Sequence, residues 1–417
     1  MRYPYKDILG VPSVPRLLVA AIVGRMPVGM GALALFLLVR GSGGSYAIAG
    51  LAVSAATLGT SFGSPLLGRL IDRQGQTRVL VLSMLVQAVS LLALAVLAPA
   101  GGFLLFGLCV VYGFSNPPLA ASMRAGWSTL FTDRSQLTRA FALDSTAQEA
   151  IWILGPLLSA SIAASIDPRA TLVAMAAFSA IGVTWFATSQ QSRTWRSAHV
   201  GERHLLGPLT ASPVRRVLAA ILGLAFAWGA LELAIAAYAD STDHSAGPLL
   251  AVWAVGSVVG GLLFALRRWS QPPQRMLGIL LTLNFVGFVV LLLAQTPWQL
   301  AVLLAVTGVV NAPVIATLYV LIESLAPRGT VTEAFTWVST TFTVGIGVGA
   351  ASAGIVSDAI EPRAAFWLAV IGGGVAVLTV VVHHHGRHKG DNERGDEPGR
   401  EHRAEGTARR PNSAGLR

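Results

Sequence analysis

Long apolar runs separated by short polar connections make up most of this chain. Runs of about twenty mostly apolar residues lie near 17–39, 46–68, 79–98, 102–123, 140–166, 170–188, 215–238, 247–266, 276–294, 298–320, 334–357 and 364–382. A helix needs ~20 such residues to cross a hydrocarbon core ~30 Å thick, whereas the strands of an outer-membrane barrel alternate over about ten residues. The pattern therefore predicts an all-α membrane protein with twelve transmembrane helices.

The composition supports this prediction. Hydrophobic residues make up 53% of the 417 positions and charged residues 12%, against about 25% charged residues in soluble proteins. A surface of this size with so few charged residues cannot be solvated by water. Lipid must therefore cover most of the protein surface. The sequence holds no Gly-Lys-Ser/Thr phosphate loop and no nucleophile–base–acid set, and Cys109 is its one cysteine. We expect no enzyme activity, no cofactor and no metal site.

The net charge of +10 is distributed unevenly along the chain. Arginines and lysines gather in one set of connections, which includes both termini, and the opposite set holds only Arg40, Arg169 and Arg363. Positively charged loops stay in the cytoplasm. We therefore expect a multi-pass protein of the cytoplasmic membrane with both termini inside the cell. The basic charge then reflects topology, and we expect no nucleic-acid partner.

The two halves of the chain repeat each other. Gly59 and Gly63 recur 197 residues later as Gly256 and Gly260, and Asn116 and Pro118 recur 195 residues later as Asn311 and Pro313. Such a near-constant offset indicates duplication, so we expect two pseudo-symmetric six-helix bundles, 1–187 and 214–384. The polar, basic segment 188–213 is predicted to be a cytoplasmic linker. The charged residues 385–417, rich in Gly and Pro, are predicted to form a disordered cytoplasmic tail.

A compact charged stretch, GRLIDRQGQTRVL at residues 68–80, connects the second and third apolar runs. Its Gly68, Asp72, Arg73, Gly75 and Arg78 resemble, in spacing and in place, the loop motif of the major facilitator superfamily. Together with the duplication, this resemblance implies the fold of that superfamily (MFS) and transport by alternating access. It also implies that the motif stabilises the outward-open state.

Elementary chemistry gives this loop a similar task. Gly68 would let backbones approach closely, Gly75 would allow a tight turn, and Asp72 would face a helix N-terminus, where the dipole favours an anion. Arg73 and Arg78 would pair with acids or lipid phosphates. These contacts would form a gate between the halves that closes in one state and opens in the other. The alternative is a positively charged loop that only sets the topology.

Charged residues inside the apolar runs cost ~2.5–3.5 kcal/mol each and usually mark pathways. Arg25 lies deep in the first run, where we expect it to face a wet cavity or an acid, or to form a structural ion pair. Asp144 and Glu149 belong to a polar face of the fifth run, and Glu149 lies near the midplane, where we expect it to carry protons. A salt bridge from Glu149 to Arg25 or Arg124 is an alternative that is compatible with this role.

Other polar and helix-breaking residues mark a possible cavity. Glu232 stands alone in the seventh run, where we expect it to bind a proton or a cationic substrate, or to be a hydrogen-bonded neutral acid. Prolines interrupt several runs, and each removes a backbone hydrogen bond and kinks its helix. The candidate cavity or hinge residues are Pro27, Asn116, Pro117, Pro118, Trp152, Trp228, Asn311 and Pro313.

These features together predict a secondary transporter. Apolar helices that carry aromatic residues and few acids favour proton-coupled efflux, by antiport, of an amphipathic or cationic small molecule. Uptake by symport, or facilitated diffusion, of a polar metabolite is the alternative, and a non-transporting membrane sensor is a more distant one. We expect the partners of a monomeric protein to be its small-molecule substrate, protons and the lipid bilayer.

Overall fold

The computed structural model describes residues 10–11, 13–97, 102–131, 133–195, 207–267, 269–326 and 331–395. Helices and turns account for these residues, and no strand occurs among them. Twelve helical segments of the described chain are long and apolar enough to cross a membrane. The predicted all-α fold with twelve spans is therefore confirmed.

The spans of the first half are α2 (Ser13–Gly41), α3 (Tyr46–Gln74), α4 (Gln76–Leu97), the pair α5 (Gly102–Phe114) and α6 (Leu119–Leu130), α7 (Arg134–Ser165) and α8 (Pro168–Ala187). Those of the second half are α10 (Ser212–Ser241), α11 (Ala246–Leu266), α12 (Pro273–Leu291), the pair α13 (Pro297–Gly308) and α14 (Asn311–Leu325), α15 (Val331–Ala359) and α16 (Phe366–Gly395). Three short helices are α9 (Gln190–Thr194), η2 (Gly207–Thr210) and η3 (Pro362–Ala365).

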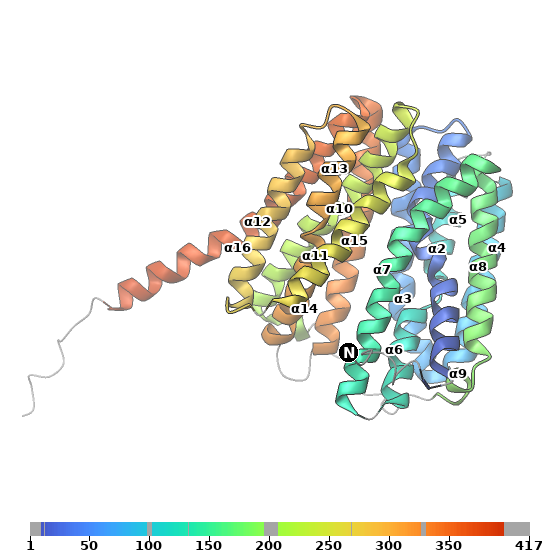
Figure 1. Ribbon diagram of the computed structural model, residues 1–417, viewed down its shortest axis with the longest axis horizontal. Coiled ribbons are helices and arrows are strands. Elements are labelled where there is room, and N and C mark those ends of the chain that lie inside the picture. Colours follow the sequence, from blue (N-terminus) through green and yellow to red (C-terminus); the bar gives the residue numbers. More distant parts are fainter. Residues whose placement is uncertain are drawn as a thin grey trace, which may run out of the picture.

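The two halves lie side by side as separate helix bundles, and α16 extends away from the second one (Figure 1). Helix α3 packs against α15 and α7 packs against α11, and these two pairs form most of the contact between the halves, with a smaller contact between α2 and α10. One large apolar core includes residues of both halves, whereas two smaller cores each belong to a single half. The halves thus share a core at one end of the molecule and have their own at the other.

Two spans are broken where the sequence predicts kinks. Helix α5 ends at Phe114 and α6 begins at Leu119, so Asn116, Pro117 and Pro118 lie in the gap between them. Residues 309–310 separate α13 from α14, which begins at Asn311. Pro313 lies in the first turn of α14, and Pro27 lies within the unbroken α2. The breaks are confirmed, and hinge motion at them stays a prediction.

The connection between the second and third spans differs from the predicted loop. Helix α3 continues through Asp72 and Arg73 to Gln74, and Gly75 alone separates it from α4. Gly75 has a φ of 87°, a conformation that other residues rarely adopt, so its predicted turn role is confirmed. A Cβ atom added to Gly68 would meet nothing within 4 Å. The predicted close backbone approach at Gly68 is wrong in this structure, because the end of α3 faces an open cleft.

The ends of the bundles also differ in detail from the expected boundaries. Helices α9 and η2 lie within the predicted linker 188–213, of which 196–206 fall outside the described residues. Helix α16 continues to Gly395, eleven residues into the tail predicted to be disordered from 385. Extending a helix costs less than starting one, so the helix that begins in the membrane continues into the polar residues that follow it.

Candidate functional site

A cleft of about 400 Å³ lies between the two halves at the end of the molecule that holds Gly75. We call this the cleft end and the other the closed end. Helices α3, α4 and α6 supply one wall and α15 supplies the other. The hydroxyl-bearing side chains of the lining are Thr60, Ser61, Ser64, Ser122, Thr336, Ser339, Thr340 and Thr343. The cleft between the halves therefore offers hydroxyl groups within a lining that also contains Pro65, Ile71 and Trp195.

At the closed end, α3 and α15 pack without a gap. A side chain in place of Gly50 would collide with the carbonyl of Ala350, and one in place of Gly354 would collide with that of Tyr46. Glycine at both positions lets the helix backbones touch. The two halves are thus in contact at one end of the α3–α15 seam and apart at the other.

A buried ion cluster holds α2, α6 and α7 together within the first half. The Arg25 guanidinium donates to Asp144 Oδ1 at 2.9 Å and to Gln148 Oε1 at 3.4 Å. Arg124 lies 3.6 Å from the other carboxylate oxygen of Asp144. The side chains of Arg25 and Asp144 are only 4% and 2% exposed, whereas that of Arg124 is 61% exposed. Arg25 thus meets an acid, Asp144, inside the first half, which fits both the acidic partner and the structural ion pair predicted for it and not a wet cavity.

Glu149 makes neither of the salt bridges considered for it. Asp144 and Glu149 are five positions apart, which is about 140° around a helix, so only Asp144 faces the arginines. Glu149 shares a helix face with Pro156, which lies against Gly247 of α11 in the other half. Trp152, 41% exposed, precedes Pro156 by one turn. Glu149 and Trp152 therefore lie on the side of α7 that faces the second half.

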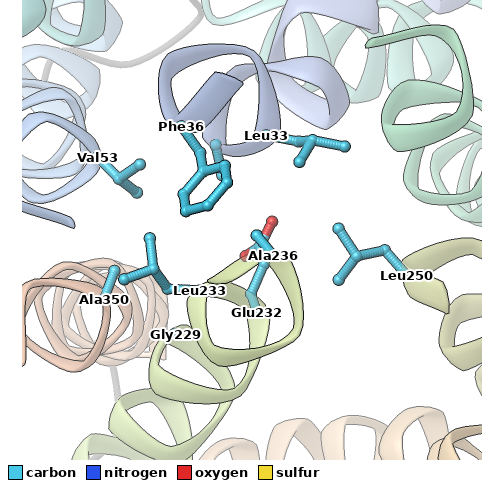
Figure 2. Close-up of a pocket in the computed structure, with 10 residues that line it drawn as sticks. Leu33, Phe36, Val53, Gly229, Glu232, Leu233, Ala236, Leu250 and Ala350 are labelled. Carbon is cyan, nitrogen blue, oxygen red and sulfur yellow. The ribbon is translucent and has the colours of Figure 1, made fainter. Parts of the chain in front are cut away.

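Glu232 faces a small cavity between the halves. Figure 2 shows its carboxylate pointing from α10 towards Leu33 and Phe36 of α2, with Leu250 of α11 and Val53 of α3 around it. The cavity leaves about 10 Å³ for the centres of water molecules, which is room for about one water. Every other residue that lines it is apolar. A single carboxylate thus lies among side chains of both halves with no charged neighbour in the described cavity wall.

Aromatic residues gather one helical turn from Glu232. The Trp228 ring lies 6.0 Å from that of Trp253 and 5.5 Å from that of Phe342, edge to face in both pairs. The indole nitrogens of Trp228 and Trp253 are buried, and neither has a hydrogen-bond acceptor among the described residues. The sequence pattern singles out Trp228 but not Trp253 or Phe342, because an aromatic residue in a uniformly apolar run gives no sign of its orientation.

The asparagines beside the broken spans bind side chains within their own half. Asn116 Oδ1 accepts a hydrogen bond from Gln87 at 3.2 Å, and Ser179 donates to the same glutamine at 2.6 Å. In the second half, Asn284 donates to Asn311 Oδ1 at 3.0 Å. These contacts join the broken spans to α4 and α12. The amides lie inside the bundles, where they stabilise the breaks and do not line the cleft.

Two of the five predicted gate residues, Gly68 and Asp72, line the cleft, together with Arg69, which was not predicted. Arg73, Gly75 and Arg78 do not belong to the cleft wall. Arg73 and Arg78 are exposed. Asp72 thus lies on the first-half wall of the cleft, across from the α15 residues of the other wall, and a gating role for it stays a prediction.

The amino-acid sequence of this chain matches a family model and a known protein. The family model described as Major Facilitator Superfamily matches residues 17–274 and 217–412. The chain is 31% identical over 140 residues to a "Multi-drug resistance efflux pump PmrA homolog" of Lactococcus lactis, and the match covers 33% of each chain. The matched part thus spans about a third of that pump's length.

Solved structures resemble nearly the whole chain. The nucleoside transporter NupG has a TM-score of 0.71 and 14% identity, and the similarity covers 89% of this chain and 98% of that one. A bacterial homologue of the iron transporter ferroportin, in its inward-facing state, has a TM-score of 0.65 and 15% identity, covering 89% and 98%. At such low identity, the likeness shows a common fold.

Proposed function

The chain belongs to the Major Facilitator Superfamily, a family of transporters, and we propose that it exports an amphipathic cation in exchange for protons. The observation that carries this proposal is Glu232. Its carboxylate lies in an apolar cavity lined by both halves, and ionisable residues inside a membrane mark substrate and ion pathways. A bound cation would supply the missing counter-charge.

The aromatic cluster supports a cationic substrate. Trp228 is four residues before Glu232 and so lies on the same face of α10. Aromatic faces attract cations, most strongly when water is excluded, and they also accommodate apolar groups. The cavity at Glu232 has room for about one water in this structure, so the substrate would enter only in a state in which the halves have moved apart there. In that state Trp228, Trp253 and Phe342 would bind the apolar body of the substrate and Glu232 its charge. The partial similarity to a multidrug efflux pump homolog points in the same direction.

We assign the proton to Glu149. An ionised carboxylate inside a membrane costs ~2.5–3.5 kcal/mol, so binding a proton lowers the cost of exposing it to each side in turn. Glu149 lies on the side of α7 that faces the other half, where rocking of the halves changes its access to water. Arg25, Asp144 and Arg124 then serve mainly to hold the first half rigid.

The cleft end is assigned to the cytoplasm. Positively charged connections cluster there, and such loops stay inside the cell. Both termini and the linker would lie on the same side, in a monomer of the cytoplasmic membrane. The structure then represents the state open to the cytoplasm.

A second candidate function is the uptake of a polar metabolite. The hydroxyl groups along the cleft favour it, because they can replace the water around a hydroxylated substrate. The fold likeness to a nucleoside transporter makes a nucleoside a suitable probe of this alternative. The single carboxylate and the aromatic cluster argue for the cation.

Proteoliposomes with an imposed pH gradient test the proposed function. We expect a lipophilic cationic dye, rhodamine 6G, to accumulate at least fivefold over protein-free liposomes, because proton flow would drive it uphill. A protonophore should remove this accumulation. Protein-dependent accumulation of uridine, with none of the dye, would instead establish the second candidate function.

Asp72→Asn is expected to lower the initial transport rate about tenfold while the amount of protein in the membrane stays unchanged. The reason is that asparagine cannot supply the negative charge that a helix N-terminus attracts when the cleft closes. A loss of ~1.4 kcal/mol in the stability of the closed cleft corresponds to a factor of ten in its population. Transport at matched expression is the measurement. The control is Glu323→Gln, an exposed acid on α14. Equal rates in both variants would show that the motif only sets topology.

A further inference from the structure

The N-terminus of α3 is capped by its own Ser45, whose hydroxyl accepts from the Ile48 N–H at 3.3 Å, and in addition by a side chain from the other half of the molecule. The backbone N–H groups of Tyr46 and Ala47 donate to the two carboxylate oxygens of Asp358, at 2.9 and 2.6 Å. Asp358 lies in the last turn of α15, 312 positions further along the chain than Tyr46. The first N–H groups of a helix have no partner within the helix, and its N-terminus attracts anions. Asp358 therefore acts as a helix cap supplied across the boundary between the halves.

A second carboxylate reinforces this contact. Arg40 of α2 donates to Asp240 Oδ2 of α10 at 2.9 Å, and the Tyr46 hydroxyl donates to the same oxygen at 3.0 Å. The Arg40 guanidinium also lies 4.2 Å from the centre of the Tyr46 ring. In all these contacts the cation and the donors belong to the first half and the carboxylates to the second. We call Arg40, Tyr46, Asp240 and Asp358 the latch.

The two carboxylates differ in what they bind. The Arg40 and Asp240 side chains are 30% and 31% exposed, and ion pairs this open to water contribute little. Asp358 instead makes two short charge-assisted bonds to backbone groups, which are about twice as strong as neutral ones. The backbone donors are also fixed in place, so no side-chain entropy is lost on the α3 side. Asp358 is itself exposed, so its advantage over Asp240 is not burial but the two short bonds to backbone groups that are already fixed in place. On that ground we assign most of the stabilisation by the latch to Asp358.

The related seam between α7 and α11 has no such cap. The repeat offset of 194 residues places Ala164 of α7 where α15 has Asp358, and the alanine side chain has no oxygen to accept a hydrogen bond. The N-terminus of α11, at Ser245, receives no hydrogen bond from a capping side chain of its own. The latch is thus a feature of one seam only within the described chain, and that seam is the one whose far end opens into the cleft.

We propose that Asp358, by capping α3 in trans, is the residue that holds the closed end shut. Opening that end requires α3 and α15 to separate, which breaks both backbone bonds to Asp358 and leaves the N–H groups of Tyr46 and Ala47 to water, while Ser45 still caps Ile48. Asp358 is exposed, so water can replace it, and the latch is reversible. This inference rests on the proposed alternating access but needs neither the proposed substrate nor the proton.

Distance measurements between spin labels test the latch without any substrate. Labels on cysteines at Ser165 of α7 and Gln295 after α12, both exposed and in opposite halves, report the separation at the closed end in a Cys109→Ser background. We expect Asp358→Asn to raise the ratio of open to closed populations about tenfold, equivalent to ~1.4 kcal/mol. Asp358→Glu, which keeps the carboxylate, should retain most of the closed population.

The matched control is Asp243→Asn. This residue is also an exposed aspartate at the closed end, but no hydrogen bond joins its side chain to the first half among the described contacts. It should leave the distance distribution unchanged. The proposal is overturned if Asp358→Asn gives the same distribution as Asp243→Asn, or if Asp358→Glu opens the molecule as much as Asp358→Asn does. Because the readout is a distance, it stays valid even if the dye is not transported.

Discussion

Replacing Glu232 by glutamine is expected to weaken the binding of a cationic substrate tenfold or more. Glutamine keeps the shape of the side chain and removes its charge. Since the cavity wall around Glu232 is otherwise apolar, no described neighbour can substitute for that charge. A charge pair in such a dry setting contributes several times more than one at a surface, so the loss should exceed that of an exposed pair.

The measurement is the dissociation constant of rhodamine 6G for the purified protein, together with substrate-induced proton movement in proteoliposomes. Glu361→Gln is the control, because Glu361 is an exposed acid that makes no side-chain capping bond. Affinity should fall only in Glu232→Gln. Glu149→Gln should bind the dye normally but lose transport driven by the pH gradient.

The same measurements show whether the roles assigned to Glu149 and Glu232 should be reversed. Loss of proton movement in Glu232→Gln alone would make Glu232 the proton carrier and contradict the assignment of Glu149. Unchanged proton movement in both variants would favour a uniporter. Unchanged dye affinity in Glu232→Gln would remove the argument for a cationic substrate.

Asp144→Asn is expected to destabilise the protein by about 3–5 kcal/mol, the usual cost of removing one partner of a buried ion pair. Arg25 would keep its charge at a site where its side chain is only 4% exposed, with only neutral acceptors among its described neighbours: the Gln148 amide, the amide of the introduced asparagine and the Ala21 carbonyl. The same reasoning predicts that Arg25→Met together with Asp144→Leu recovers most of the loss, because no unpaired charge then remains inside the bundle.

The apparent melting temperature in detergent measures this effect. Arg124→Met serves as the comparison, since that side chain is 61% exposed and lies 3.6 Å from Asp144. Exposed pairs contribute about 0–1 kcal/mol, so its melting temperature should change little. A double variant no more stable than Asp144→Asn would mean that the pair has a task beyond neutralising charge, such as a role in transport.

The sequence alone determined the number and kind of the membrane spans in this protein. A run of about twenty apolar residues can be compared directly with the thickness of a bilayer, so the twelve spans needed no knowledge of their neighbours. The broken spans at Pro118 and beside Asn311 were equally local, because proline removes a hydrogen bond wherever a helix places it. The Gly75 turn followed from the conformation that glycine alone adopts readily.

Only the tertiary structure decided which polar groups meet. Helices that are apolar on all sides carry no periodic pattern to fix their rotation, so the sequence could not choose between Asp144 and Glu149 as the partner of Arg25. It could not show that Asn116 binds Gln87, or that Trp253 and Phe342 surround Trp228. Contacts across the two halves depend on how rigid bundles tilt against each other. For that reason the Asp358 cap on α3, and the end of the molecule that it closes, could be found only once both halves were placed in space.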